Sequence, residues 1–227
     1  MIGVVIPAHN EQALIANCVQ SVRTASACAQ LLGEDVQTVV VLDHCHDLTG
    51  DLARCHGALT LPINDQNVGM ARAAGADLMI GRGARWLAFT DADSVVSPQW
   101  LSAQLALRCD AVCGTVSIRE WAGYGERMRR HFDAIYTDAD DHRHIHGANL
   151  GVSTAAYLRA GGFQPLRSSE DVALVARLTE VGASIAWSAT PRVVTSARKT
   201  FRAPGGFGAT LAAIEAQGSW ALQTASP

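Results

Sequence analysis

Short apolar runs rich in β-branched residues alternate with helical patterns through the first half of the chain. The runs predict strands at 2–6, 36–42, 58–63, 85–90 and 111–118. The segments between them predict helices at about 11–30, 48–56, 69–81 and 98–108, the last with Ser97 as N-cap and Pro98 at its first position. Alternation of this kind is typical of an α/β fold with a mostly parallel central sheet flanked by helices, a Rossmann-like arrangement.

The second half of the chain is less regular. Its patterns predict helices at about 120–137, 154–160 and 169–182, with a serine capping the third, and short strands at 184–187 and 192–196. A Gly-rich turn at 205–206 and a last helix follow. Because no repeat or low-complexity linker interrupts the sequence, we expect residues 1–227 to form a single domain.

Composition and charge exclude several classes of protein. Apolar residues make up 48% of the chain and charged residues 17%, which indicates a globular protein, and the net charge of −3 predicts no nucleic-acid partner. No apolar stretch reaches the length of a transmembrane segment, and the chain opens on a strand without a signal sequence. We therefore expect a cytoplasmic protein with six reduced cysteines and no structural zinc, since the spacing in 44–56 matches no standard zinc motif.

Polar clusters follow three of the predicted strands, at the point where each strand ends. They are Pro7 to Glu11, Asp43 to Asp47 and Asp91 to Asp93. Ligands of parallel α/β sheets bind at the carboxyl ends of the strands, and turn chemistry alone does not require three such clusters at one edge. The sequence therefore predicts a binding site there.

The third cluster is an Asp-x-Asp pair directly after a buried strand. On an extended chain, Asp91 and Asp93 would lie on one side, roughly 6–7 Å apart. Two carboxylates so placed suit one hard divalent cation, the usual partner of a substrate diphosphate. Alone, the pair also fits an ordinary turn at a strand end.

Five short motifs in order resemble family 2 glycosyltransferases of the GT-A fold. They are VVIPAHNE at 4–11, DHCHD at 43–47, NVGMAR at 67–72, the Asp-x-Asp pair, and GGFQPLRSSED at 161–171. The resemblance implies a nucleotide-binding half at about 1–118 and an acceptor-side half at about 119–227. It also implies a hexosyltransferase-type enzyme, which moves a sugar from a nucleoside-diphosphate sugar to an acceptor hydroxyl with inversion at the anomeric carbon.

The resemblance implies a role for each matching residue of the nucleotide half. Pro7, Ala8 and Glu11 shape the nucleoside pocket. Asp43 accepts a hydrogen bond from an N–H of the base, and Arg72 lies near the base and phosphates. The resemblance also favours a UDP- or GDP-sugar as the donor.

The remaining motif residues carry the metal and the acid–base chemistry that the resemblance implies. Asp91 and Ala92 contact the nucleotide, Asp91 also being a metal ligand, and Asp93 binds Mn²⁺ or Mg²⁺. Asp171 is the expected general base, with Glu170 as its competitor, because an acceptor hydroxyl needs a carboxylate to take its proton.

Two further candidates lie in the second half. His142, His144 and His146 alternate and would share one face of an extended segment. Of these, His146 is the best candidate for an additional metal ligand, and the other two are expected in a solvated loop. Arg198 can clamp a diphosphate, because a guanidinium offers two parallel hydrogen bonds to phosphate.

Departures from the family pattern leave alternatives open. His44 stands where many family members have a second acid, and the Gln-x-x-Arg-Trp signature of processive synthases is absent, which indicates a non-processive enzyme. A non-catalytic or degenerate nucleotide-sugar-binding protein is the main alternative. A nucleotidyltransferase is the second, disfavoured because the first loop is not the Gly- and Lys/Arg-containing loop of those enzymes.

Overall fold

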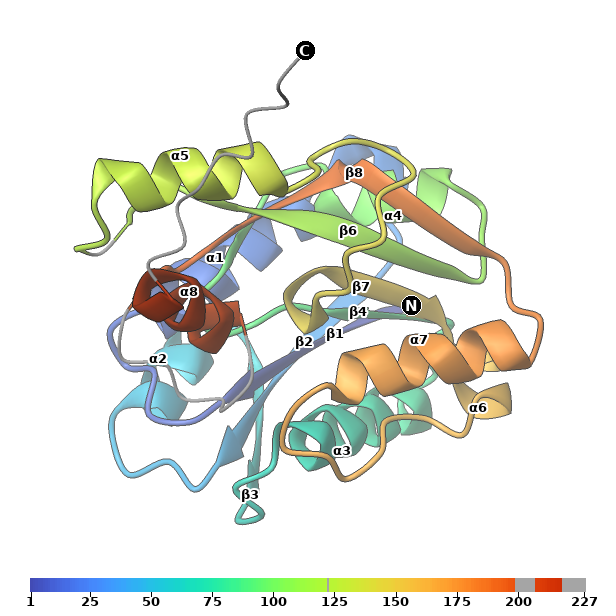
Figure 1. Cartoon of the computed structure of the whole chain (residues 1–227). Coiled ribbons are helices and arrows are strands. Elements are labelled where there is room, and N and C mark those ends of the chain that lie inside the picture. Colours follow the sequence, from blue (N-terminus) through green and yellow to red (C-terminus); the bar gives the residue numbers. More distant parts are fainter. Residues whose placement is uncertain (122, 199–206, 218–227) are drawn as a thin grey trace.

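A computed structural model describes residues 1–121, 123–198 and 207–217, and its described strands form one sheet of eight (Figure 1). The strands are β1 (Ile2–Ala8), β2 (Val36–Asp43), β3 (Leu59–Ile63), β4 (Trp86–Phe89), β5 (Val95–Val96), β6 (Ala111–Ile118), β7 (Leu150–Ser153) and β8 (Ile185–Thr195). Their spatial order is β3-β2-β1-β4-β7-β6-β8-β5. The first four neighbours are parallel, β7 is antiparallel to both β4 and β6, and β8 is parallel to β6.

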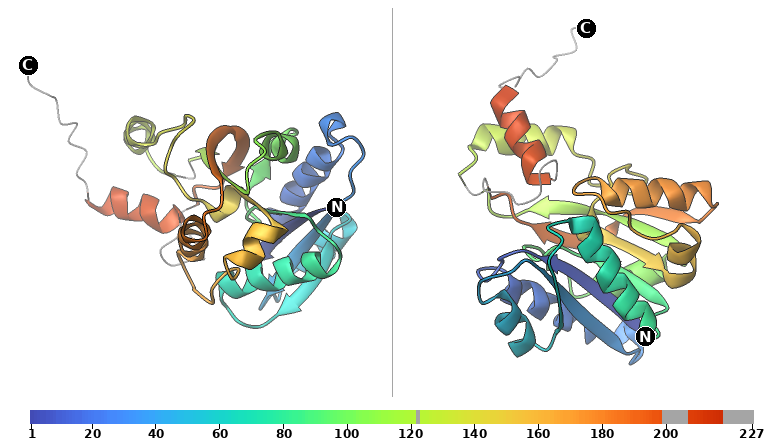
Figure 2. Two further views of the ribbon diagram at one scale, coloured as in Figure 1. Left: turned by 90° about the vertical axis from the view of Figure 1, so that its right-hand side faces the viewer. Right: turned by 90° about the horizontal axis from the view of Figure 1, so that it is seen from below.

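Helices cover both faces of the sheet (Figure 2). They are α1 (Ile15–Ser26), α2 (Thr49–Cys55), α3 (Val68–Gly81), α4 (Trp100–Ala106), α5 (Glu126–Ile135), α6 (Thr154–Arg159), α7 (Glu170–Glu180) and α8 (Phe207–Gln217), with 3-10 helices η1 (Ala29–Leu31) and η2 (Gly147–Asn149). One apolar core lies between the sheet and α1, α2 and α4, and a second between the sheet and α3, α6 and α7. The predicted α/β fold with a mostly parallel sheet flanked by helices is confirmed.

Strands in the second half differ from the prediction. The segments 184–187 and 192–196 belong to one long strand, β8, which continues through Pro191 past a register shift opposite Gly114 and Val116. Proline donates no backbone hydrogen bond, so a strand pattern looks broken there although the backbone stays extended. The sequence patterns also missed β5 and β7, which have two and four residues and are too short to show a period.

Helix starts differ as well. The first helix begins at Ile15 rather than near residue 11, because 11–14 form turns. The fourth begins at Trp100, and Ser97 accepts the hydrogen bond of a turn through its backbone oxygen instead of capping a helix. At α7, Ser169 has a left-handed backbone (φ 60°) and its side chain makes no capping bond. The predicted Gly-rich turn at 205–206 lies outside the described residues.

A third apolar cluster joins α5 to α8 and to the segment that follows β8. Met128 and Phe132 of α5 pack with Leu211 of α8 and with Ala197, whose surface is fully buried. The cluster therefore fixes the chain just before Arg198, which enters the site described below.

Among the described residues no helix is both long and apolar enough to cross a bilayer.

Gly69 near the start of α3 has no room for a side chain. A Cβ built there would lie 2.2 Å from the Gln164 carbonyl oxygen and 2.8 Å from that of Leu166. The Gly69 amide donates to the Leu166 oxygen at 3.1 Å, and the Asn67 side chain donates to Pro165 at 3.0 Å. The Asn-x-Gly motif thus holds the loop that leads into α7.

We predict that Gly69→Ala lowers the free energy of unfolding by about 1–3 kcal/mol, because the backbone of 164–166 must move. Gly81→Ala in the same helix is the control, since no atom lies within 4 Å of its added carbon. Alanine suits a helix better than glycine, so Gly81→Ala should be neutral or stabilising by up to about 1 kcal/mol. Urea denaturation measures both, and an equal effect of the two changes would contradict this account.

Candidate functional site

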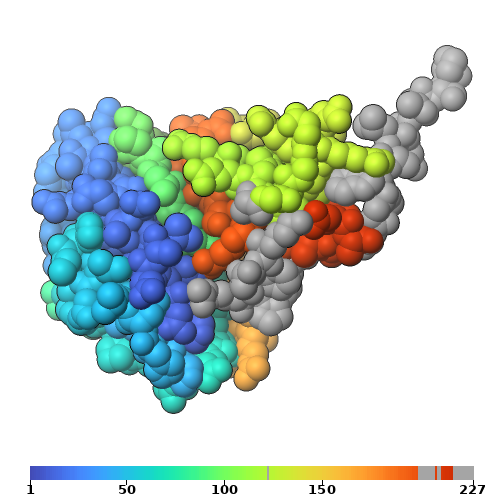
Figure 3. All heavy atoms as spheres, turned by 90° about the vertical axis from the view of Figure 1, so that its left-hand side faces the viewer, coloured from blue at the N-terminus to red at the C-terminus, as the bar shows by residue number. Residues whose placement is uncertain are grey.

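The loops that follow β1, β2 and β4 meet at the carboxyl edge of the parallel strands. Figure 3 faces this edge. The first two loops, in blue and cyan, lie at the left of the view, and α5 and α8, in yellow-green and red, lie to the right of them. All three polar clusters predicted from the sequence lie in these loops or in the last residues of the strands before them. The topology therefore brings together segments far apart in the chain, Glu11 and Asp91 being 80 residues apart.

Hydrogen bonds join the β1–α1 loop to the β2–α2 loop. The Glu11 amide donates to the Thr49 hydroxyl at 2.7 Å, and the Gln12 amide donates to Asp47 at 3.1 Å. The Asn10 side chain accepts from the His46 amide at 2.8 Å. These bonds fix the backbone of Glu11 and leave its carboxylate for another partner.

Asp43 organises the start of α3. Its carboxylate accepts from the amides of Asp65, Gln66 and Asn67 at 2.7–2.9 Å, and the residue is only 5% exposed. A carboxylate offers about four acceptor positions, so three of those on Asp43 hold the chain itself. The Asp43 carbonyl accepts from His9 Nδ1 at 2.7 Å.

Asp91 and Asp93 lie on a turn and not on an extended strand. The strand β4 ends at Phe89, and the Ser94 amide closes a turn onto the Asp91 carbonyl at 3.0 Å. Ala92 between them is buried. The two carboxylates consequently take different partners: that of Asp91 binds Arg72 and that of Asp93 binds Arg198. The sequence prediction of an extended pair is corrected in this respect.

Arg72 is buried between two carboxylates. Its side chain is 4% exposed; Nη2 donates to Asp91 at 2.6 Å, and Nη1 donates to Glu170. A Cβ on Gly147 would lie 2.3–2.8 Å from the guanidinium, so the absence of a side chain at Gly147 lets Arg72 lie against the backbone. One guanidinium therefore connects the Asp-x-Asp turn to the start of α7.

Glu170 and Asp171 occupy different environments. Glu170 is 4% exposed and is neutralised by Arg72, whereas Asp171 is partly exposed. Asp171 Oδ2 accepts from the Gly147 amide at 2.7 Å, and no ion pair of Asp171 occurs among the described residues. Of the two carboxylates, Asp171 is therefore the one that stays accessible from solvent, while Glu170 is enclosed with Arg72.

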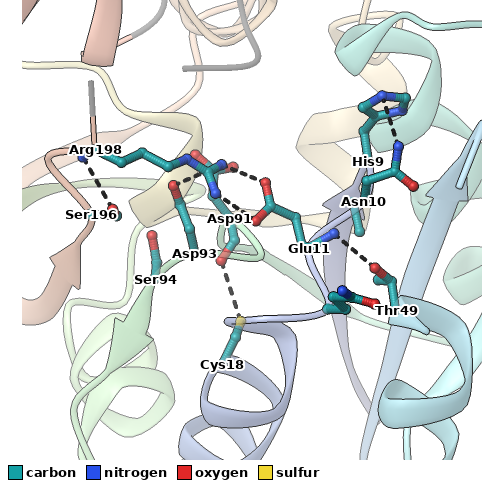
Figure 4. Close-up of polar contacts among 12 residues, drawn as sticks. His9, Asn10, Glu11, Cys18, Thr49, Asp91, Asp93, Ser94, Ser196 and Arg198 are labelled. Carbon is teal, nitrogen blue, oxygen red and sulfur yellow. Dashed lines mark hydrogen bonds and ion pairs between the residues drawn. The ribbon is translucent and has the colours of Figure 1, made fainter. Parts of the chain in front are cut away.

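Arg198 reaches the cluster from the other side (Figure 4). It forms two bonds to the Glu11 carboxylate, one of 2.7 Å from Nη1 to Oε2 and one from Nη2 to Oε1, and Nη2 lies 3.3 Å from Asp93 Oδ2. Arg198 comes from the segment after β8, and Glu11 and Asp93 come from the loops after β1 and β4. The sequence indicated Arg198 as a phosphate ligand and gave no sign of this pairing.

Negative charge exceeds positive charge in this group. The carboxylates of Glu11, Asp91, Asp93 and Glu170 share the guanidinium groups of Arg72 and Arg198, which leaves two formal negative charges when all four acids are ionised. Burial, followed by the charge of Asp91, raises the pKa of Asp93 to about 7. Such a group attracts a cation.

The side chains that could act as metal ligands fit a divalent cation only in part. No three His, Cys, Asp or Glu side chains among the described residues gather as a metal site, so His146 does not join Asp91 and Asp93. Two carboxylates suit Mg²⁺ or Mn²⁺ when substrate phosphates supply further oxygen ligands. The residues present therefore fit a metal bound together with a diphosphate rather than a cage built by protein alone.

His146 faces Tyr136. The Tyr136 hydroxyl accepts from the Val116 amide at 2.9 Å and lies 2.9 Å from His146 Nε2, so it can donate its proton there. Burial lowers the pKa of His146 to about 4, which keeps the ring neutral. The rings of His142, His144 and His146 stack along one face, as the alternation predicted, but His142 is buried at 2% exposure and does not belong to a solvated loop.

Pro7 and Ala8 are the last residues of β1. Ala8 is buried, and its carbonyl accepts from Cys45 Sγ at 3.3 Å.

Sequence reasoning missed Gly147 and Tyr136 as parts of the site. The signal at Gly147 was the glycine itself, because a glycine in an extended segment often marks close approach to a backbone. Nothing in the sequence identified Tyr136.

Comparison with known proteins identifies the family to which the chain belongs. The model of glycosyl transferase family 2 matches residues 3–164, which is more than half of the chain. The chain belongs to this family. The predicted resemblance to family 2 glycosyltransferases is therefore confirmed, and no curated protein sequence matches the chain.

Solved structures share the fold at low identity. TarS of S. aureus in complex with UDP-GlcNAc has 16% identity and a TM-score of 0.67, over 91% of this chain and 61% of that one. TarS with UDP has 15% identity and a TM-score of 0.65, over 86% and 60%. Mannosyltransferase PcManGT from Pyrobaculum calidifontis, in complex with GDP-Man and Mn²⁺, has 16% identity and a TM-score of 0.62, over 88% and 57%. The chain thus spans about three fifths of the chains in these structures, the two TarS chains being residues 1–349.

We predict that Asp93→Asn stabilises the metal-free protein at pH 8. The folded-state pKa of Asp93, about 7, exceeds the ordinary 3.8, so the folded protein gains stability as pH falls through this window and loses it as pH rises. Removing the charge should raise the free energy of unfolding by about 1–3 kcal/mol at pH 8 and by less at pH 5.5.

Urea denaturation with a chelator at the two pH values tests this. Asp51→Asn is the control, because Asp51 is exposed and paired only with Arg54 at the surface, so its effect should stay within about 0.5 kcal/mol. A destabilisation by Asp93→Asn that is the same at both pH values would show that its charge is not a cost to folding.

Proposed function

We propose that the protein transfers a sugar from a nucleoside-diphosphate sugar to an acceptor hydroxyl, with metal assistance and with inversion at the anomeric carbon. Membership of the family and the nucleotide-sugar complexes of the similar structures support the donor class. The observation that carries the proposal is the Arg72 bridge. It links the Asp-x-Asp turn to the helix start that presents Asp171, so that the groups for donor and acceptor adjoin each other.

On this proposal, Asp171 is the general base. Its carboxylate takes the proton of the acceptor hydroxyl as the oxygen attacks the anomeric carbon, the bond to the diphosphate oxygen breaks, and the nucleoside diphosphate leaves. Glu170 acts through Arg72 as a positioning residue, because an ion-paired and buried carboxylate is a poor proton acceptor. The Gly147 amide orients Asp171 by holding Oδ2.

The donor lies along the carboxyl edge in this proposal. Pro7, Ala8 and Glu11 border the nucleoside, and Asp43 has one acceptor position left for an N–H of the base. Arg198 binds the diphosphate. Asp91 and Asp93 would hold Mn²⁺ or Mg²⁺, and such a cation neutralises the charge that grows on the leaving diphosphate.

Changing Asp171 to Asn should abolish transfer without abolishing donor binding. We expect kcat to fall by about 100- to 10,000-fold, the usual contribution of a general base, while the Kd of the nucleotide stays within about threefold. The control is Glu180→Gln at the exposed end of the same helix. Product formation and nucleotide binding are measured on both, and undiminished transfer by Asp171→Asn would remove Asp171 from this role.

A nucleotide panel identifies the donor. Saturating UDP or GDP with Mn²⁺ should stabilise the fold by about 2–3 kcal/mol at a hundredfold excess over Kd, and a chelator should remove most of this gain. Thermal unfolding measures it. Release of nucleoside diphosphate from the matching sugar donor then separates an enzyme from a protein that only binds the nucleotide sugar. If neither nucleotide stabilises the protein, the donor class proposed here is wrong.

A further inference from the structure

The segment between α5 and β7 leads back to Asp171, the proposed base (Figure 1). Near its end lies Gly147, whose amide donates to Asp171 Oδ2 at 2.7 Å. On one side of this amide the chain is fixed by Asn149, which is fully buried and whose side chain donates to two backbone carbonyls at 2.7 and 2.9 Å. The position of the Gly147 amide then depends on what holds the chain on its other side, at His146.

The hydroxyl of Tyr136 links His146 to the sheet. It accepts from the Val116 amide of β6 at 2.9 Å and lies 2.9 Å from His146 Nε2. Burial raises the pKa of Tyr136 to about 12 and lowers the pKa of His146 to about 4. The hydroxyl therefore keeps its proton and the imidazole stays neutral, so that the hydroxyl can accept from Val116 and donate to Nε2 at the same time.

The ring of Tyr136 is fixed as well. It stacks on Phe132 of α5 with ring centroids 4.7 Å apart and an interplanar angle of 17°. On the side of the 142–146 segment it stacks on His144, with centroids 4.1 Å apart and an angle of 8°. Because the ring is stacked on both, its hydroxyl is a well-defined point of attachment for His146.

We propose that Tyr136 is a positioning residue of the site, which fixes the Gly147 amide, and through it the Asp171 carboxylate, by attaching His146 to β6. The inference rests on the proposed function for the role of Asp171 as general base. A hydrogen bond to one carboxylate oxygen sets the direction of the other. Misplacement of a reacting group by about 1 Å can cost about 100-fold in rate, so an attachment remote from the chemistry can matter to it.

Tyr136→Phe removes the hydroxyl and keeps the ring that stacks on Phe132 and His144. We expect kcat for sugar transfer to fall by up to about 100-fold. Nucleotide binding should stay close to that of wild type, because the Tyr136 contacts described above lie outside the loops that follow β1, β2 and β4. A loss in kcat without a loss in nucleotide binding separates positioning of the base from a general disturbance of the site.

Tyr157→Phe is the matched control. Tyr157 is also buried, burial also raises its pKa to about 12, and its hydroxyl also accepts from a backbone amide, that of Phe163, at 3.1 Å. The change thus removes a comparable hydrogen bond from a tyrosine that does not attach His146. We expect its kcat to stay near the wild-type value.

Nuclear magnetic resonance without substrate tests the positioning itself. In wild type, the Gly147 amide proton resonance should follow the ionisation of Asp171 in a pH titration, because a hydrogen bond to the charged carboxylate is stronger than one to the neutral acid. Asp171→Asn should abolish this response and so assign it. We expect the response to be lost in Tyr136→Phe and retained in Tyr157→Phe.

His146→Phe, which keeps a ring in the stack but cannot accept the Tyr136 proton, serves if Tyr136→Phe does not fold by circular dichroism. It should lose the response too. A full Gly147 response in either folded variant overturns the inference, as do its absence from wild type and an equal loss in Tyr157→Phe. If the response is lost while kcat is unchanged, the positioning stands and Asp171 is not the base, so that failure of the two proposals is distinguished.

Discussion

The two ion pairs of Arg72 are the interaction on which the rest of the site depends. The Arg72–Glu170 pair is buried on both sides, and removing one partner of such a pair leaves an uncompensated charge, at a cost of about 3–5 kcal/mol. Here the pairs also join two halves of the fold, because Arg72 lies on α3, Asp91 follows β4 and Glu170 begins α7. The same guanidinium thereby connects the Asp-x-Asp turn to the start of α7, where Asp171 lies.

Glycines make this arrangement possible. Gly147 gives Arg72 the space it needs against the backbone, and Gly69 lets the loop at 164–166 pack on α3 before it enters α7. The two contacts act on the same end of α7. The Asn-x-Gly motif, which in sequence resembles part of a nucleotide-binding site, therefore also positions the start of α7 and with it Asp171.

Two arginines divide the excess of acidic groups between them. The Arg72 side chain is enclosed at 4% exposure, whereas the Arg198 side chain is 25% exposed and is paired with Glu11 and Asp93. The difference follows from where each residue lies: Arg72 is on α3 with its guanidinium over the Phe163 ring, 5.9 Å from the ring centroid, and Arg198 follows β8. A buried carboxylate beside a second one is unfavourable for folding when ionised, and the raised pKa of Asp93 reflects this.

The sequence by itself determined the α/β fold, the family, and the loops that carry Glu11, Asp43, Asp91 and Asp171, because strand–helix alternation and motif order are local properties. Tertiary structure alone decided which acid is paired and which is accessible, that Asp93 faces Arg198, and that His146 turns to Tyr136. Glu11 and Arg198 are 187 residues apart. A contact over that distance depends on how the sheet closes and on which side chains are shielded from water, and no pattern of neighbouring residues encodes it.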